Sequence, residues 1–195
     1  LPGDDDRQFS WPEAEQIVLD AFIGFDPEMA ATAKPFFERS WIDAAPRPGK
    51  SSGAFSHPVT PSAHPYILMN FAGKSRDVMT LAHEMGHGVH QCLAAANGYL
   101  MSDTPLTLAE TASVFAEMLA FRQLVDSAED ADTRRVLLAG KVEDMLNTVV
   151  RQIAFHNFET AFHGARGNGE LTAEEISDVW MDTQRAALGP AVRIG

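Results

Sequence analysis

The stretch His83-Glu84-Met85-Gly86-His87 decides how this chain folds and what it can bind. Residues four apart on a helix lie about 40° apart around its axis, so His83 and His87 project from one face, one turn apart. Two imidazole rings at that separation can reach a single Zn²⁺. Glu84 lies about 100° further round, where its carboxylate can contact a metal-bound water without displacing it. The pattern therefore predicts a zinc-binding helix.

The residues around this motif support a buried helix. The flanking segments, residues 78–82 and 89–93, are apolar and compatible with a helix that carries a metal inside a protein. Gly86 and Gly88 each cost up to about 1 kcal/mol in a helix interior relative to alanine. Close packing near the metal is one explanation for these glycines, and simple tolerance is the other. The competing interpretation of the motif is a helix whose two histidines form hydrogen bonds in the core.

A catalytic zinc site needs a third protein ligand and keeps its fourth position open for water. His90 lies seven residues after His83, but three consecutive turns of a straight helix cannot converge on one ion, so His90 flanks the ligands. Glu110 and Glu117 share a face of the next predicted helix, in an apolar run where an unpaired charge is costly. One carboxylate can bind the metal while the other hydrogen-bonds a ligand histidine, unless both form a solvated stripe.

The rest of the chain is predicted to be mainly helical with a minor sheet. Helix-breaking and capping residues predict helices at residues 11–25, 27–41, 75–97, 105–126, 130–163 and 172–187. We expect a kink or an early stop at Pro35, and a bend or break in the helix at 130–163 because of its length. Residues 43–53 are rich in proline and glycine and predict a loop, and two short strands are expected at 54–56 and 66–71.

Composition excludes several classes of protein. The 195 residues are 45% apolar and include 12 phenylalanines, which excludes a disordered chain, and no run approaches the roughly 20 apolar residues that span a bilayer. A formal charge of −12 argues against nucleic acid as a partner, since phosphate binding needs clustered lysine and arginine. A single cysteine can form no internal disulfide and no signal peptide is visible, so we expect a cytoplasmic protein.

Four segments of the chain resemble one enzyme family. They are residues 49–56 (GKSSGAFS), 65–71 (PYILMNF), 77–90 (DVMTLAHEMGHGVH) and 109–113 (AETAS). Together they are similar to the M3 family of zinc oligopeptidases, and in particular to its oligoendopeptidase F branch. The resemblance covers most of the chain, and its HExGHxxH run followed by a distant glutamate is specific. It implies a zincin-like helix packed on further helices, with a small β-sheet beside the active site.

The resemblance also implies a role for each residue of the site. His83, His87 and Glu110 would be the ligands of one Zn²⁺ per chain. Glu84 would be the general base of a metallopeptidase that hydrolyses short peptides through a metal-activated water. Glu117 would hold a ligand histidine from beside the metal. These roles agree with the spacing argument and favour Glu110 over Glu117 as the third ligand.

A peptide-binding element is implied as well. In this family a β element beside the metal helix lines the cleft, so the predicted strands would form part of its wall. We therefore expect Gly53, Ala54 and Phe55 to contact the substrate. An extended peptide can add to a free strand edge there through main-chain hydrogen bonds.

Members of the family are much longer than this chain. The resemblance implies that residues 1–195 are one unit of a larger catalytic domain, made of a helical lead-in (1–42), a loop and small β element (43–72) and the zinc-site helices (73–195). Family members also carry a later motif, rich in histidine and tyrosine, that is thought to stabilise the oxyanion, and this chain has no match for it. We therefore expect the remainder of the enzyme to be missing here, and this chain alone to be weakly active or inactive.

Two other functions compete with a peptidase. In the first, the metal only ties two helices together in a non-catalytic zinc-binding scaffold, whose fourth coordination position is closed. In the second, the chain is a helical interaction module without metal, and the histidines have other partners. Metal content separates the second from the others, and the effect of Glu84→Gln on hydrolysis separates the peptidase from the scaffold.

Overall fold

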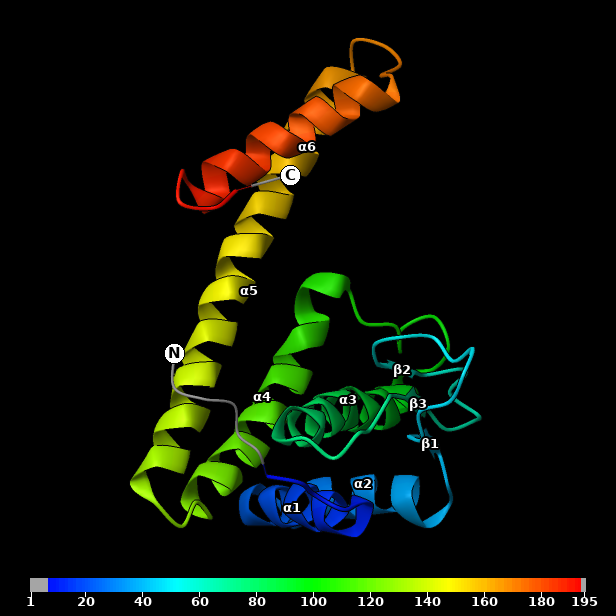
Figure 1. The fold of residues 1–195 in the computed structure, drawn as a ribbon. Helices are drawn as coiled ribbons and strands as arrows, with labels where there is room; N and C mark the ends of the chain where they lie inside the picture. The colour runs from blue at the N-terminus through cyan, green and yellow to red at the C-terminus, as the bar shows by residue number, and fades with distance from the viewer. Residues whose placement is uncertain (1–6, 194–195) are drawn as a thin grey trace. The chain divides into compact units, whose positions relative to one another are not determined.

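The computed structural model describes residues 7–193 of the chain (Figure 1). Its elements occur in the order α1 (Trp11–Phe25), α2 (Pro27–Glu38), β1 (Ile42–Asp43), β2 (Phe55–His57), β3 (Tyr66–Leu68), α3 (Ser75–Ala94), the 3₁₀ helix η1 (Ala95–Asn97), α4 (Leu106–Asp126), α5 (Ala131–Arg166) and α6 (Ala173–Leu188). The predicted class, mainly helical with a small sheet, is confirmed. By its internal contacts the chain divides into two compact units, residues 1–136 and 137–195.

The first two helices begin where their sequences predict. The hydroxyl of Ser10 accepts a hydrogen bond from the backbone of Glu13, and the Glu13 carboxylate accepts one from the Ser10 N–H at 2.7 Å. This reciprocal pair is a capping box. The sequence predicts that the second helix reaches residue 41, but α2 ends at Glu38 because Ser40 has a left-handed conformation, with φ of 56°. The helix continues through Pro35 to Glu38, so the early stop expected at Pro35 is not found at that residue.

The small sheet has the strand order β1-β3-β2. β1 is parallel to β3, with Ile42 opposite Ile67, and β2 is antiparallel to β3, with Ser56 also opposite Ile67. The sequence analysis missed β1, because two residues that lead into a proline-rich segment show no alternation. It also extended β3 to residue 71. The strand ends at residue 68, yet the N–H of Phe71 still donates to the carbonyl of Ala44 at 2.9 Å.

Helix α3 is central to the first unit and packs against α1, α2, α4 and the strands β2 and β3 (Figure 1). Its fully buried apolar side chains are Val78, Leu81, Ala82 and Met85. They pack in a core to which α1 contributes Phe22 and α2 contributes Phe36. A Cβ at Gly88 would lie 2.8 Å from the Phe36 ring, so this glycine allows α2 to lie close to α3. The core therefore fixes the metal-motif helix against three others.

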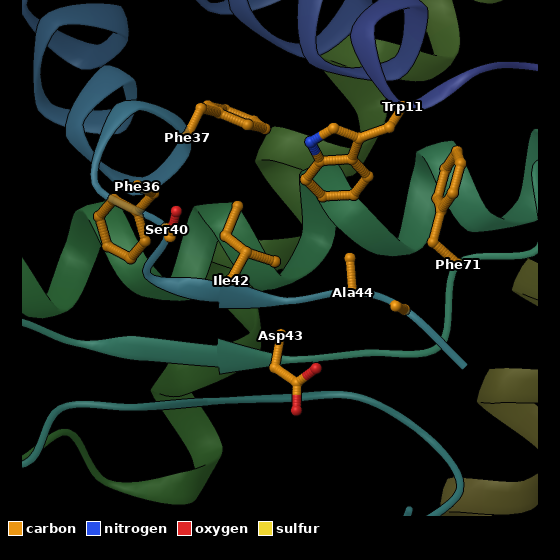
Figure 2. Close-up of a pocket in the computed structure, with 9 residues that line it drawn as sticks. Trp11, Phe36, Phe37, Ser40, Ile42, Asp43, Ala44 and Phe71 are labelled. Carbon is orange, nitrogen blue, oxygen red and sulfur yellow. The ribbon is translucent and has the colours of Figure 1, made fainter. Parts of the chain in front are cut away.

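A second apolar layer lies between the N-terminal helices and β1 (Figure 2). Trp11 contacts Phe37 and Phe71, with ring centroids 6.0 Å and 5.3 Å away. Figure 2 shows Ile42 directed toward these rings, beside a cavity of about 390 Å³, and Asp43 directed away from them. This alternation is what a strand with one buried face requires.

The second unit contains most of α5 and all of α6. Phe155 and Phe158 of α5 pack on Trp180 of α6, with ring centroids 5.9 Å and 5.1 Å away. Helix α5 is continuous from Ala131 to Arg166, so the break predicted from its length is not found there. Across the part of the chain that the structure describes, none of the helices has the length and apolar character needed to cross a membrane.

Candidate metal centre

Close contact between α3 and α4 creates the site. A Cβ at Gly86 would lie 2.6 Å from the carbonyl oxygen of Ala112 and 2.7 Å from the Cβ of Ala116, closer than packed atoms can approach. Only glycine fits at this crossing, so the close packing predicted for Gly86 is confirmed. The crossing brings Glu110, at the start of α4, next to the two motif histidines of α3.

Three side chains converge at this point. The Nε2 atoms of His83 and His87 lie 3.2 Å and 3.5 Å from Oε2 of Glu110. One ligand atom from each of the three residues lies within 4.8 Å of the other two. The two imidazole rings are nearly perpendicular, at 82°, with centroids 5.1 Å apart. The helical spacing thus presents both histidines to one carboxylate of the neighbouring helix.

This donor set fits a zinc ion. Two imidazole nitrogens and one carboxylate oxygen are a common set for zinc sites that leave a fourth position open. Two donors that each lie about 2.1 Å from one tetrahedral ion are about 3.4 Å apart, which is close to the observed 3.2 Å and 3.5 Å. Among residues 7–193, His83, His87 and Glu110 form the one group of this kind.

Glu117 contacts the other side of the first histidine. Its Oε2 atom lies 3.0 Å from Nδ1 of His83, and its side chain is mostly buried. A carboxylate on Nδ1 fixes the direction of the ring and leaves Nε2 for a metal. The spacing argument left Glu110 and Glu117 open as alternatives, and the structure places Glu110 at Nε2 of both histidines and Glu117 at Nδ1 of His83.

Ser113 is a residue of the site that the sequence analysis did not assign. Its hydroxyl is completely buried and donates to Oε2 of Glu110 at 2.7 Å. That is the same carboxylate oxygen that faces both histidines. In the sequence analysis this serine is only the last residue of the segment 109–113 that resembles the family. The available signal was its spacing of three residues from Glu110, which puts both side chains on one face of α4.

Glu84 lies against strand β2 of the sheet and is not part of the group formed by His83, His87 and Glu110. It is 6% exposed, and the backbone N–H of Ser56 in β2 donates to its carboxylate. Within the described residues the second oxygen, Oε2, is buried and has no hydrogen-bond partner. Burial raises the pKa of Glu84 to about 7. A buried carboxylate with one unpaired oxygen can accept a proton from a small molecule such as water.

The two histidines differ in their surroundings. Burial lowers the pKa of His87. Burial also acts to lower the pKa of His83, but the hydrogen bond with Glu117 and the charges of Glu84 and Glu110 outweigh it, so the pKa of His83 is raised. The carboxylates around His83 therefore supply the negative charge that a divalent cation would also require.

Ser56 ties the sheet to the metal-motif helix. Its hydroxyl donates to Oε1 of Gln91 at 2.8 Å, and Nε2 of Gln91 donates to the Ser56 carbonyl at 3.2 Å. With the bond from its N–H to Glu84, Ser56 uses all its polar groups to fix β2 on α3. The predicted placement of a strand beside the motif helix is thus found, although neither Ser56 nor Gln91 was singled out from the sequence.

The remaining predicted site residues lie around this centre. His90 is in α3 but outside the ligand group, and its charge acts to lower the pKa of His87. Gly53 and Ala54 precede β2, and Phe55 begins it with a half-exposed side chain. The carbonyl of Gly53 accepts a hydrogen bond from Asn70 at 3.3 Å. Contact of Gly53, Ala54 and Phe55 with a substrate stays a prediction.

Comparison with known proteins agrees with this geometry. The sequence model of peptidase family M3 matches residues 27–194. The chain belongs to this family. Among its M3 relatives, the chromosomal oligoendopeptidase F of Lactococcus lactis subsp. cremoris is 32% identical over 186 residues, which cover 94% of this chain and 31% of the relative. Oligopeptidase PepF of Bacillus subtilis is 31% identical over 196 residues, covering 100% of this chain and 29% of the relative.

Solved structures show the same fold. A protein from Chlamydophila abortus superimposes with a TM-score of 0.72 at 27% identity, covering 94% of this chain and 31% of that protein. PZ peptidase A, solved with an inhibitor, gives a TM-score of 0.75 at 19% identity, covering 92% of this chain and 31% of that one. This M3 chain therefore spans about 30% of the length of the curated relatives it matches.

Proposed function

We propose that this chain is the metal-bearing part of a zinc peptidase that hydrolyses short peptides. The observation that carries the proposal is the group formed by His83, His87 and Glu110, with the buried carboxylate of Glu84 beside it. Relatives named oligoendopeptidase F and oligopeptidase support short peptides as the substrate class. A zinc ion at this group, when bound, supplies a Lewis acid for the scissile carbonyl and for a water.

Glu84 is assigned as the general base. It follows the ligand His83 directly in α3, and the bond from Ser56 holds its carboxylate in place while Oε2 stays unpaired in the described residues. Glu84 takes one proton from the attacking water as the new C–O bond forms. It then donates that proton to the nitrogen of the leaving amine as the C–N bond breaks, so the carboxylate is regenerated.

Glu117 and Ser113 keep the ligands in position. Glu117 holds the His83 ring through Nδ1, and Ser113 holds the Glu110 carboxylate through Oε2. Glu117 and Ser113 both lie on α4, whereas His83 lies on α3. A shift of α4 relative to α3 would therefore misplace the ligands. Preorganised ligands reduce the conformational entropy that metal binding costs.

The substrate is assigned to the outer edge of β2, the strand at one end of the sheet order. Phe55 and His57 pair with β3, and the backbone of Ser56 is bonded to α3. Within residues 7–193 the backbone groups of Ala54 have no hydrogen-bond partner, so they are the ones open to an extended peptide. A peptide bonded to Ala54 lies beside the carboxylate that Ser56 positions.

The Glu84→Gln substitution in the intact protein tests this function. We expect hydrolysis of short peptides to fall by about a hundredfold or more, because the proton acceptor is lost, while one zinc per chain is retained. Glu143→Gln, at an exposed position of α5, is the matched control and should change neither quantity. Full hydrolysis by the Glu84→Gln variant would show that Glu84 is not the base.

The same measurements separate a peptidase from a zinc scaffold. A scaffold binds zinc but hydrolyses no peptide even when Glu84 is present, and its metal has no exchangeable water.

The weak or absent hydrolysis expected of these 195 residues alone stays a prediction. Hydrolysis rates of this chain and of a full-length relative, compared on one peptide, check it.

A further inference from the structure

The backbone of Ser56 points out of the sheet toward helix α3. Ser56 lies opposite Ile67 in the pairing of β2 with β3, but the N–H of Ile67 donates to the Trp41 carbonyl on the far side of β3, at 2.9 Å. In an antiparallel pair, alternate residues direct their backbone groups away from the partner strand. The N–H and carbonyl of Ser56 therefore need partners outside the sheet, because an unpaired backbone group shielded from water is unfavourable.

Two side chains of α3 are these partners. Glu84 and Gln91 are seven residues apart, so they lie on one face of the helix, about 10 Å apart along its axis. The N–H of Ser56 donates to the Glu84 carboxylate, and Nε2 of Gln91 donates to the Ser56 carbonyl at 3.2 Å. A single residue of β2 thus connects Gln91 to Glu84.

The amide of Gln91 makes two different bonds to this serine. Its Nε2 donates to the backbone carbonyl, while its Oε1 accepts from the hydroxyl at 2.8 Å. An amide carries a donor and an acceptor side by side, so it can bond both groups at once. A carboxylate in its place would repel the carbonyl, and an alkyl group would bond neither. Gln91 is also half-buried, which reduces competition from water for these bonds.

We propose that Gln91 is a positioning residue for the general base Glu84, and that it acts through Ser56. The inference rests on the proposed peptidase function. The Ser56 N–H holds the carboxylate, and within residues 7–193 the Oε2 atom of Glu84 has no hydrogen-bond partner, so this oxygen is left for a water. Gln91 is outside the ligand group, so its effect on Glu84 passes through the position of β2. A shift of the strand by about 1 Å would break the bond and let the carboxylate rotate.

The alternative is that Gln91 only covers the edge of the sheet. Side chains that occupy the backbone groups of an edge strand protect the strand from pairing with other chains and stabilise the fold. That role predicts a change in hydrolysis that is independent of Glu84. A positioning role predicts a change that disappears once Glu84 has been replaced, because the group to be positioned is gone.

A double-mutant cycle in the intact, zinc-loaded protein separates these roles. Gln91→Met keeps the length of the side chain and removes both bonds, so we expect kcat for a short peptide to fall about tenfold, with one zinc per chain retained. In the Glu84→Gln background the same change should lower the residual rate by about twofold at most. Gln123→Met, at an exposed position of α4, is the matched control and should leave kcat unchanged. Tenfold losses in both backgrounds would overturn the positioning role.

Hydrogen exchange tests the same link without catalysis. In the metal-free protein, Gln91→Met should speed exchange of the Ser56 amide about tenfold, because β2 no longer holds that N–H against Glu84. The amide of Met85, in the buried part of α3, should keep its rate, which shows that the fold is retained. Unchanged exchange at Ser56 would overturn the proposal. Faster exchange at Ser56 in a protein that hydrolyses no peptide would overturn only the peptidase function, since Gln91 would still set where Ser56 holds the Glu84 carboxylate.

Discussion

The imidazole of His83 lies between two carboxylates of α4. Its Nδ1 atom is 3.0 Å from Oε2 of Glu117, and its Nε2 atom is 3.2 Å from Oε2 of Glu110. Glu117 thus contacts Nδ1 of the ring and Glu110 contacts Nε2, so the two glutamates have different roles. A partner on Nδ1 sets the tautomer and direction of the ring, and Nε2 is then the atom that a metal can bind.

Glu117→Gln should weaken zinc binding without unfolding the protein. The amide keeps the shape of the side chain but loses the charge that holds His83, so we expect the affinity for zinc to fall by about 10- to 100-fold. Competition with a chromophoric chelator measures this change, and circular dichroism checks the helix content. Glu143→Gln serves as the exposed control. Unchanged affinity in Glu117→Gln would mean that the contact does not support the ligand.

Ser113→Ala should also weaken zinc binding, through Glu110. The substitution removes the buried hydroxyl that donates to Oε2 of Glu110 at 2.7 Å, so the carboxylate becomes free to rotate. We expect a loss of about tenfold in zinc affinity, measured with the same chelator. Ser127→Ala is a matched control, because Ser127 ends the same helix and donates only to the Leu124 carbonyl at 3.0 Å. Equal losses in both variants would argue against a role for Ser113 in holding Glu110.

Sequence reasoning reached the ligand group because helical spacing alone aligns His83 with His87. It could not choose between Glu110 and Glu117 on that ground, since residues seven apart share a face and only the register of α4 against α3 separates them. That register depends on Gly86, whose missing Cβ lets the two backbones meet. The interhelical contact is a tertiary property that no local pattern encodes.

The fold shows the same difference between features that local sequence determines and features that depend on long-range contacts. Capping residues and apolar periodicity predicted the six α-helices of residues 7–193, because they act within one turn of the chain, but the predicted helix at 75–97 ends at Ala94 and continues as the 3₁₀ helix η1. The end of α2 and strand β1 were missed or misplaced. They depend on the left-handed Ser40 and on the parallel pairing of Ile42 with Ile67, which lies 25 residues later. Long-range pairing of a two-residue strand leaves no periodic signal in the sequence.

The loop around Asp43 should make stability sensitive to acid. Both oxygens of Asp43 bind Arg47 at 2.7 Å, and Lys50 binds Oδ1 at 3.0 Å, so the pKa of Asp43 is held well below its usual range. A lowered pKa stabilises the fold above the unfolded value of about 3.9, and this contribution is lost as the pH falls below it. We expect Asp43→Asn to have a lower Tm than the unaltered protein at pH 7.

The role of Asp43 is tested by measuring how the difference in Tm between Asp43→Asn and the unaltered protein changes with pH. The gap in Tm between the two proteins should begin to narrow as the pH is lowered from 5 to 3, because the Asp43 carboxyl then becomes protonated in the unfolded state while it stays charged in the folded protein. Since Asp43 is partly exposed, the gap should be small, and thermal melts at each pH detect it. A gap that stays constant down to pH 3 would contradict the assignment.

Gly86→Ala should disrupt both the fold and the metal centre. The added Cβ would lie 2.6 Å from the Ala112 carbonyl, a backbone atom that cannot move without shifting α4. We expect a loss of about 1–3 kcal/mol in the free energy of unfolding, measured with urea, together with weaker zinc binding, because Glu110 moves away from the histidines. Gly140→Ala is the matched control in a helix interior, since nothing lies within 4 Å of its added Cβ. That variant should instead gain about 0.5–1 kcal/mol from higher helix propensity. If Gly86→Ala were also stabilised, the two helices could not be in the contact that places Glu110 beside His83.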